Sequence, residues 1–233
     1  MPHLFHHNAF IVLSNGIDAR IGSLASRYDY FHEWKRLDEN EPGVVDMETL
    51  LKGICTKHNF LDLFENSLLF DDSSGTLVKI IVRNHQLLGV NRAIQAVRER
   101  KERLGKLGVF WHTQGSGKSY SMVFFTRKVH RTLGGQFTFL ICTDRDDLDT
   151  QIYKTFAGCG LVDNDRDPCR AGSGEHLQTL LGLHKPYVFT LIHKFNKDVD
   201  PSQPYSDRGD IIERRGLIGR SEETRSALPE SGC

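Results

Sequence analysis

A glycine-rich loop constrains the fold more than any other feature of this sequence. Residues 115–119 are Gly-Ser-Gly-Lys-Ser, and they stand between a short apolar segment, residues 108–111, and a segment of helical composition that extends to about residue 131. Glycines let backbone N–H groups turn toward a bound anion, and a helix that begins at the loop adds the partial positive charge of its N-terminus. A strand, such a loop and a helix, in this order, predict a phosphate-binding loop in an α/β fold.

The segments after the loop predict a parallel sheet. Residues 136–142 and 187–192 are apolar and rich in strand-forming side chains, and residues 147–156 between them are expected to form a helix. Alternation of strands and helices is typical of parallel strands covered by helices. Residues 159–175 are rich in Gly, Asp and Asn, which predicts a surface loop. Proline and glycine interrupt residues 200–233, which are expected to be mostly irregular.

The start of the chain predicts a smaller mixed α/β segment. Residues 9–14 are apolar strand formers, and they are followed by Asn15 and Gly16, a pair that closes hairpins. Residues 46–70 carry apolar side chains at helical spacing, which predicts two short helices. Residues 71–75 are a polar, turn-rich cluster, and we expect an internal boundary there.

A strand and a long helix are expected between this boundary and the glycine-rich loop. Residues 78–82 are β-branched and apolar, and residues 85–104 have apolar side chains on one helical face. The end of that helix, residues 92–106, holds six basic residues against two acidic ones. A solvated helix face explains this charge better than a nucleic-acid-binding patch, although both interpretations stay open.

Composition excludes several classes of protein. The 30 Lys and Arg residues balance the 30 Asp and Glu residues, so the chain is not a globally basic nucleic-acid binder. With 39% hydrophobic residues it can bury a core, and no apolar run approaches the length that a membrane-spanning helix needs. The N-terminus lacks the charged and apolar regions of a signal peptide, so a cytoplasmic protein without a membrane partner is expected.

The residue types in the loop predict ATP binding. The lysine neutralises the β- and γ-phosphates, and the serine hydroxyl after it holds Mg²⁺. The strict pattern has glycine where this chain has His112, and the alternative is an incidental glycine-rich turn with a surface lysine. The residues expected to bind ATP are Gln114, Gly115, Ser116, Gly117, Lys118 and Ser119, with Mg²⁺ at Ser119.

Hydrolysis of ATP needs a further acid, usually at the end of an apolar strand. Only Asp210 and Glu213, around two isoleucines, approach this pattern, and two arginines follow them directly. We therefore expect a chain that binds ATP and does not hydrolyse it unaided, and the catalytic residues stay unknown.

Several motifs together resemble the R (motor and restriction) subunit of type I restriction-modification enzymes. They are residues 82–86 (Val-Arg-Asn-His-Gln), residues 109–119 around the loop, and residues 143–151 after the next strand. Residues 12–16 and 31–35 are also similar to the stretch that joins the nuclease domain of that family to its first helicase domain. The likeness extends over residues 8–196, and the family tolerates His at position 112.

The resemblance implies an ATP-dependent site-specific deoxyribonuclease with RecA-like folds that translocates along double-stranded DNA. It implies that the side-chain amide of Gln86 reads adenine and that Arg145 and Lys194 contact DNA. Partners would be double-stranded DNA and the methyltransferase (M) and specificity (S) subunits. The domains would be the end of a nuclease domain with linker helices (residues 1–75), a partial RecA-like P-loop domain with a parallel sheet (76–199) and an aberrant tail (200–233).

The chain also departs from this family. Its Asp-Glu-Ala-His box is absent, because Glu213 is followed by Arg-Arg-Gly. Glu33, Trp34 and Lys35 imitate the Glu-x-Lys of the nuclease, with Asp18 or Asp29 upstream, but the family's own trio lies nearer the N-terminus. We therefore expect a fragment that is inactive alone; the alternatives are a P-loop nucleotide-binding protein without DNA function and an inactive gene remnant.

Overall fold

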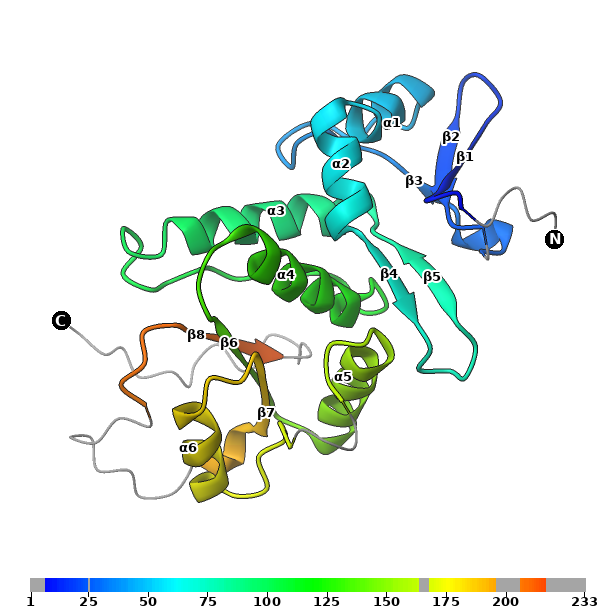
Figure 1. The fold of residues 1–233 in the computed structure, drawn as a ribbon. Coiled ribbons are helices and arrows are strands. Elements are labelled where there is room, and N and C mark those ends of the chain that lie inside the picture. The colour runs from blue at the N-terminus through cyan, green and yellow to red at the C-terminus, as the bar shows by residue number, and fades with distance from the viewer. Residues whose placement is uncertain (1–6, 25, 164–167, 196–205, 217–233) are drawn as a thin grey trace, which may run out of the picture. The chain divides into compact units, whose positions relative to one another are not determined.

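The fold is described from a computed structural model, drawn in Figure 1, which covers residues 7–24, 26–163, 168–195 and 206–216. The backbone divides into two compact units. The first unit holds residues 1–137 and 150–168, and the second unit holds residues 138–149 and 169–233. The domains expected at residues 1–75, 76–199 and 200–233 stay a prediction.

The first unit begins with the predicted hairpin. Strands β1 (Ile11–Ser14) and β2 (Ala19–Gly22) pair antiparallel, and β3 (His32–Glu33) adds to β2 after the 3₁₀ helix η2 (Tyr28–Tyr30). The side-chain oxygen of Asn15 accepts hydrogen bonds from the backbone N–H groups of Ile17 and Asp18, at 2.9 and 2.7 Å. Gly16 has a φ of +93°, which side chains disfavour. The Asn-Gly turn is therefore confirmed.

The two short helices predicted before residue 70 are also confirmed. They are α1 (Met47–Ile54) and α2 (Lys57–Asn66). Asp46 caps α1 by accepting a hydrogen bond from the N–H of Thr49 at 2.6 Å, and Thr56 caps α2. Apolar residues at helical spacing on each helix reach the core, where Leu50, Ile54 and Leu63 are fully buried.

The polar cluster at residues 71–75 is a hairpin turn. It joins β4 (Leu68–Asp71) to β5 (Val78–Ile81), which pair antiparallel, and Gly75 has a φ of +77°. The turn prediction is confirmed, but the strands on its two sides are partners in one unit and no linker separates them. Helix α3 (Asn84–Arg98) follows and ends about six residues earlier than expected, where residues 99–105 form turns.

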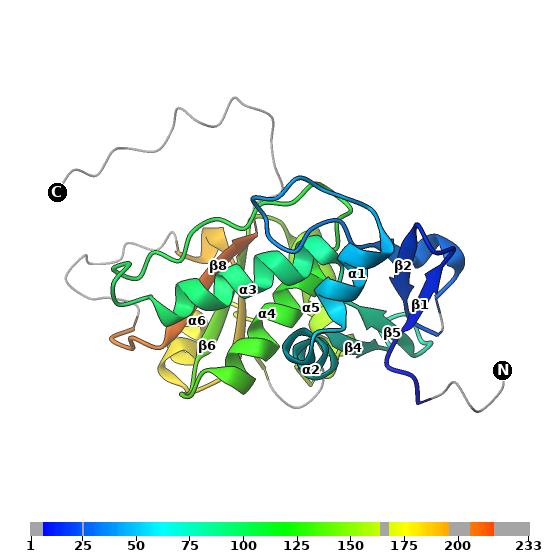
Figure 2. The same cartoon turned by 90° about the horizontal axis from the view of Figure 1, so that it is seen from above.

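The strand expected at residues 108–111 is wrong. These residues have no ladder partner, and Val109 and Trp111 are 94% and 76% exposed. An apolar segment becomes a strand only when its backbone pairs, and here Gly108 has a φ of +105° that breaks extended geometry. Phe110 instead packs against Gly89 of α3. The helix after the loop, α4 (Lys118–Thr132), is confirmed and lies beside α3 in both views (Figures 1 and 2).

The second unit contains the predicted parallel sheet. Its central strand β6 (Thr138–Thr143) pairs with β7 (Tyr187–Leu191) on one side and with β8 (Ile211–Gly216) on the other. The expectation that residues 200–233 are mostly irregular is therefore wrong for residues 211–216. Residues 200–205 and 217–233 lie outside the described part of the chain.

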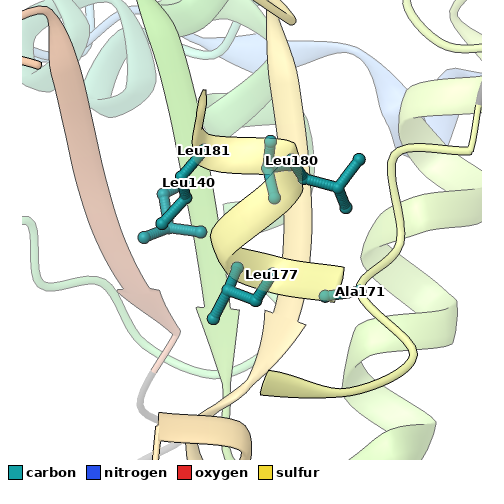
Figure 3. Close-up of a cluster of buried hydrophobic side chains, with 6 residues drawn as sticks. Leu140, Ala171, Leu177, Leu180 and Leu181 are labelled. Carbon is teal, nitrogen blue, oxygen red and sulfur yellow. The ribbon is translucent and has the colours of Figure 1, made fainter. Parts of the chain in front are cut away.

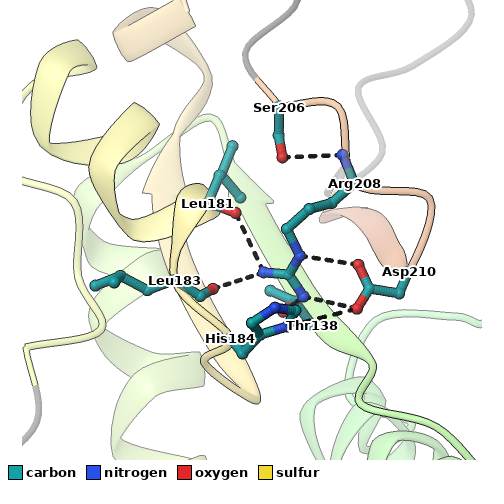
Figure 4. A network of polar contacts seen from close by, with 7 residues as sticks. All are labelled: Thr138, Leu181, Leu183, His184, Ser206, Arg208 and Asp210. Carbon is teal, nitrogen blue, oxygen red and sulfur yellow. Dashed lines mark hydrogen bonds and ion pairs between the residues drawn. The ribbon is translucent and has the colours of Figure 1, made fainter.

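Strand β8 forms because its start is anchored, although its sequence is only briefly apolar. The guanidinium of Arg208 donates to both carboxylate oxygens of Asp210, at 2.9 and 2.8 Å, and to the hydroxyl of Thr138 at 2.9 Å (Figure 4). It also donates to the carbonyl oxygens of Leu181 and Leu183. These bonds tie the segment before β8 to the start of β6, so the next residues fall into register beside that strand.

Helices α5 (Asp146–Gly158) and α6 (Gly174–Gly182) follow β6 and precede β7. The first was predicted, but α6 was missed because its residues 174–175 belong to the segment expected as a loop. Its apolar residues have helical spacing and pack on the sheet in the core cluster shown in Figure 3, which contains Leu140, Ala171, Leu177, Leu180, Leu181 and Val188. Within the described residues, no helix is both long and apolar enough to cross a membrane.

Candidate functional site

The glycine-rich loop has the backbone geometry that anion binding needs. Gly115 and Gly117 have φ angles of +77° and +80°, which residues with side chains rarely adopt. Gly117 is the N-cap of α4, and no side chain caps the first N–H groups of this helix. Uncapped N–H groups and the helix dipole together favour a negative ligand at this position.

The side chains of the loop suit a polyphosphate. The Nζ atom of Lys118 donates a hydrogen bond to the carbonyl oxygen of His112 at 2.7 Å, so the ammonium group folds back over the loop. The hydroxyl of Ser116 is buried and has no hydrogen-bond partner among the described residues. A cation, a buried hydroxyl and uncapped N–H groups in one loop fit phosphate oxygens. The role of Ser119 as a ligand of Mg²⁺ stays a prediction.

Gln86 lies at the start of α3 and contacts this loop. Its Nε2 atom donates hydrogen bonds to the carbonyl oxygen of Gly117 at 2.9 Å and to the hydroxyl of Ser121 at 3.1 Å. Its Oε1 atom accepts a hydrogen bond from the N–H of Arg83 at 2.9 Å, and the residue is 3% exposed. The structure therefore places Gln86 against the loop, while adenine reading stays a prediction.

Histidines gather beside the loop, which sequence reasoning missed. The Nε2 atom of His85 lies 3.3 Å from the carbonyl oxygen of Ser116, and its ring stands edge-on to that of His112 at 4.7 Å. Burial lowers the pKa of His85. Burial, and then the charges of Arg83 and His85, lower the pKa of His32 from 6.5 to about 4. His85 belongs to the motif at residues 82–86 and His112 to the one at residues 109–119, but only the fold brings His32 near His85.

The stability of the chain is expected to fall as the pH is lowered from about 6.5 to about 4, in part because of His32. In this window the unfolded chain binds a proton at His32 and the folded chain does not, so acid favours unfolding. The free energy of unfolding, from urea titrations at a series of pH values, should depend less on pH in His32→Gln. His58→Gln, at an exposed position, is the control; an unchanged pH slope in His32→Gln would contradict the assignment.

Helix α4 is anchored to the β4–β5 hairpin close to the loop. The hydroxyl of Tyr120 donates to the carboxylate of Asp71 at 2.5 Å, and Arg127 donates to the carbonyl oxygen of Leu68 at 2.9 Å. Burial and the Asp71 carboxylate raise the pKa of Tyr120. Burial, followed by the charge of Asp71, raises the pKa of Cys159 to about 12, so this thiol stays protonated at neutral pH. The cluster is structural and it sets the position of the first turn of α4.

The predicted DNA contacts, Arg145 and Lys194, belong to the second unit. A cavity of about 240 Å³ lies at the carboxyl ends of β6 and β7, and Lys194 lines it. The ammonium group of Lys194 donates to the carbonyl oxygen of Ala171. Arg145 is half exposed, and its Nε atom is 3.8 Å from the carboxylate of Asp147. Arg145 is thus accessible to a ligand, whereas Lys194 already has a partner.

An ion pair in the same cavity was not predicted. Arg170 donates to one carboxylate oxygen of Asp149 at 2.5 Å, and the other oxygen is buried without a hydrogen-bond partner among the described residues. Asp149 belongs to the first turn of α5, and Arg170 forms a bridge with Phe189 of β7. The two residues are 21 positions apart, so sequence reasoning had no signal that pairs them.

Asp210 and Glu213, the candidates for the acid of ATP hydrolysis, do not lie at the carboxyl end of β8. Asp210 lies before the first residue of β8 and binds Arg208, which lowers the pKa of the Asp210 carboxyl group. Glu213 lies inside β8, opposite Leu140. In a parallel sheet ligands bind at the carboxyl ends of the strands, so Asp210 is at the wrong end.

The Glu-x-Lys imitation is also a structural feature. The carboxylate of Glu33 pairs with Arg20 and with Lys35, at 3.1 Å each, and Trp34 is buried. The part of the chain that the structure describes has no group of three His, Cys, Asp or Glu residues that could hold a metal ion.

The sequence around this loop matches a known family. A sequence profile of the SWI2/SNF2 ATPase family matches residues 85–214, more than half of the chain. The chain belongs to the SWI2/SNF2 ATPase family. The match includes the glycine-rich loop, α4, the strands β6 and β7, and the first residues of β8. Membership implies the use of ATP, and a mixed α/β fold with a parallel sheet agrees with a helicase-like architecture.

This SWI2/SNF2 ATPase is similar to two type I restriction enzyme subunits. It is 34% identical over 229 residues to the HindI endonuclease subunit of Haemophilus influenzae. It is 27% identical over 242 residues to a proposed MjaIXP endonuclease subunit of Methanocaldococcus jannaschii. Each match covers 91% of this chain but only 21% and 22% of the relatives, so the chain spans about a fifth of their length. The predicted resemblance to endonuclease subunits of type I restriction enzymes is confirmed.

Proposed function

We propose that this chain is part of the ATP-dependent motor of a type I restriction enzyme. It binds ATP and Mg²⁺ through residues 114–119 of a RecA-like domain, and it contacts double-stranded DNA as the complete enzyme moves along it. The observation that carries this proposal is the loop itself: two glycines with positive φ lead into the uncapped N-terminus of α4, and Lys118 lies over them.

Different groups of the loop bind different parts of the ligand. Backbone N–H groups of residues 115–119 cradle the phosphates, and the ammonium group of Lys118 balances their negative charge. Mg²⁺, bound through the hydroxyl of Ser119, would neutralise charge on the phosphate oxygens. To reach them, Lys118 exchanges its bond to the carbonyl oxygen of His112 for bonds to phosphate.

DNA contacts are proposed for Arg145 and Lys194, beside the carboxyl ends of β6 and β7. Arginine and lysine side chains bind phosphate oxygens without reading the base sequence, which suits a protein that tracks the DNA backbone. The sequence specificity would come from the S subunit, which together with the M subunit completes the enzyme in the cytoplasm. The described residues offer no acid at the carboxyl end of β8, so hydrolysis by this chain alone is not expected.

Arg145→Ala is expected to weaken binding of a DNA duplex by this chain and to lower the salt dependence of binding. Each lost phosphate contact reduces the slope of log affinity against log salt by about 1. Fluorescence anisotropy with a labelled duplex at several salt concentrations measures this slope. Lys57→Ala, at an exposed position on α2, is the matched control. An unchanged slope in Arg145→Ala would remove this residue from the DNA surface.

The rate of ATP hydrolysis by the intact Haemophilus influenzae relative distinguishes two functions. One is a motor that moves on DNA, and the other is a P-loop protein without DNA function. If the motor function is right, double-stranded DNA raises its rate of ATP hydrolysis, and single-stranded DNA of the same length does not. A kinase or a nucleotide switch would show the same rate with and without DNA.

A further inference from the structure

We propose that the basic turn, which is residues 98–106 at the end of α3, contacts the phosphate backbone of duplex DNA. The cations that make this contact are Arg98, Lys101 and Lys106. They bind phosphate oxygens through their charge and do not read the base sequence. The inference rests on the proposed contact of the chain with DNA, and it adds a DNA contact in the first unit to those proposed in the second.

The structure changes how the charge of this segment is understood. A solvated helix face requires the basic residues to lie along a helix, but α3 ends at Arg98 and residues 99–105 form turns. These turns project beyond the end of the helix in both views (Figures 1 and 2). Five basic and two acidic residues give the basic turn a net charge of +3, whereas the whole chain has a net charge of 0. The positive charge is therefore concentrated on one short projection.

Two arginines of the basic turn are held by the protein itself. The guanidinium of Arg103 pairs with the carboxylate of Glu99 at 2.6 Å. The guanidinium of Arg100 donates to the carbonyl oxygen of Val97 at 3.1 Å and lies 5.3 Å from the centre of the Phe137 ring. These contacts fix the turn to the body of the first unit, and they use one of its two acidic residues.

The other three cations of the basic turn are available to a ligand. Arg98, Lys101 and Lys106 are exposed, and their side chains have no hydrogen bond or ion pair with another described residue. The remaining acidic residue of the turn, Glu102, can offset only one of them. Like charges that stand close together repel one another, and a bound polyanion removes this repulsion.

The backbone presents these cations in a preformed arrangement. The N–H of Gly105 donates to the carbonyl oxygen of Arg100 at 2.8 Å, and the N–H of Lys106 donates to that of Arg103 at 2.9 Å. Between these bonds Leu104 has a φ of +52°, which a leucine rarely adopts, and it is 88% exposed. Because the turn is already closed by its own hydrogen bonds, less conformational entropy is lost when a ligand binds.

Duplex DNA fits this surface better than a small anion or a protein partner. A small anion is bound in a concave cradle of N–H groups, whereas these cations stand on a projecting turn (Figure 1). Protein–protein interfaces are depleted in lysine, and protein–DNA interfaces are much more positively charged. A DNA duplex carries one negative charge for about every 1.7 Å of its axis, so neighbouring phosphates can meet neighbouring cations.

The basic turn is electrostatically separate from the glycine-rich loop. Gln86 near the start of α3 contacts the loop, and Arg98 is the last of the 15 residues of this helix. A helix rises 1.5 Å per residue, so α3 is about 20 Å long. This length exceeds the Debye length of about 8 Å at physiological salt. Removing charge from the turn should therefore leave the affinity for ATP unchanged.

The test measures the affinity of the 233-residue chain for a labelled DNA duplex by fluorescence anisotropy at several salt concentrations. The alanine variant combines Arg98→Ala, Lys101→Ala and Lys106→Ala. Each lost phosphate contact lowers the slope of log affinity against log salt by about 0.9, so we expect the slope to fall by about 2 to 3. The affinity at about 0.1 M salt should fall about a hundredfold.

The matched control removes the same charge from other places. It combines Arg27→Ala, Lys57→Ala and Lys154→Ala, one arginine and two lysines at exposed positions of the first unit. Its net charge equals that of the alanine variant. A larger loss of slope in the alanine variant than in this control therefore assigns the effect to the basic turn and not to the total charge.

A second variant tests whether charge alone is used. It combines Arg98→Lys, Lys101→Arg and Lys106→Arg, and it should keep the slope of the wild-type chain because phosphate contacts need only the charge. Calorimetric titration of ATP checks that each variant is folded, since its affinity for ATP should equal that of the wild type.

The outcomes distinguish this inference from the proposed function. Equal slopes in the alanine variant and its matched control overturn the inference, and the basic turn is then solvated or binds an acidic protein. The proposed function stands in that case if Arg145→Ala still lowers the slope. A lower slope in the charge-conserving variant also overturns the inference. A wild-type chain that does not bind the duplex overturns the proposed DNA contact together with the inference.

Discussion

Lys118→Ala is expected to weaken the binding of ATP by this chain about tenfold to a hundredfold. Hydrogen bonds to charged groups contribute about 1.5–3 kcal/mol, and each 1.4 kcal/mol changes an affinity about tenfold. The ammonium group of Lys118 already lies over the loop, 2.7 Å from the carbonyl oxygen of His112, so it reaches phosphate by a small movement. Calorimetric titration of ATP with Mg²⁺ into both chains measures the change.

The control for this prediction is Lys106→Ala, which removes an exposed lysine before the loop and should leave the affinity unchanged. Circular dichroism of each variant confirms that the fold persists. Equal affinities of Lys118→Ala and the wild type would show that the loop is an incidental glycine-rich turn.

Lys128→Met is expected to lower the free energy of unfolding by about 3–5 kcal/mol, because it leaves a nearly buried carboxylate without its partner. The Nζ atom of Lys128 donates to Asp62 and to Asn91 at 2.6 Å each, and the side chains of Lys128 and Asp62 are only 10% and 13% exposed. The lysine thus joins α2, α3 and α4. Urea unfolding followed by circular dichroism measures the loss.

The matched control is Lys52→Met, which breaks an exposed ion pair with Glu48 on α1 and should lower the free energy of unfolding far less, because solvent screens this pair. Replacing both members of the buried pair, in Lys128→Met with Asp62→Leu, should recover part of the loss because neither charge then remains. A loss in Lys128→Met as small as that in Lys52→Met would show that water screens the buried pair.

Most regular elements could be predicted because their patterns are local. The hairpin at Asn15 depends on a turn of neighbouring residues, and α1 and α2 depend on apolar spacing and on the caps Asp46 and Thr56. The same reasoning was wrong for residues 108–111 and for β8. Whether a segment becomes a strand depends on pairing with a distant partner. For β8 the partner is β6, and the hydrogen bond from Arg208 to Thr138, 70 residues away, holds the two strands in register.

In the candidate site, too, local features could be predicted and long-range contacts could not. The loop residues 115–119 are contiguous, so their chemistry could be predicted from their types and order. The engagement of Gln86 with Gly117 spans 31 residues, and the bond between Tyr120 and Asp71 spans 49. No spacing rule connects such positions. They meet only because α3, α4 and the β4–β5 hairpin pack in one unit.

The sequence by itself determined the family resemblance and the parallel sheet, and it predicted the phosphate-binding loop, because glycines with lysine, apolar periodicity and turn pairs act within a few residues. Only the tertiary structure decided that the amide of Gln86 is occupied by the loop, that Asp210 stands at the wrong end of its strand and that Lys194 already has a partner. Hydrogen bonds are short and directional, so whether a side chain can serve a ligand depends on which distant groups the packed fold brings within about 3 Å of it.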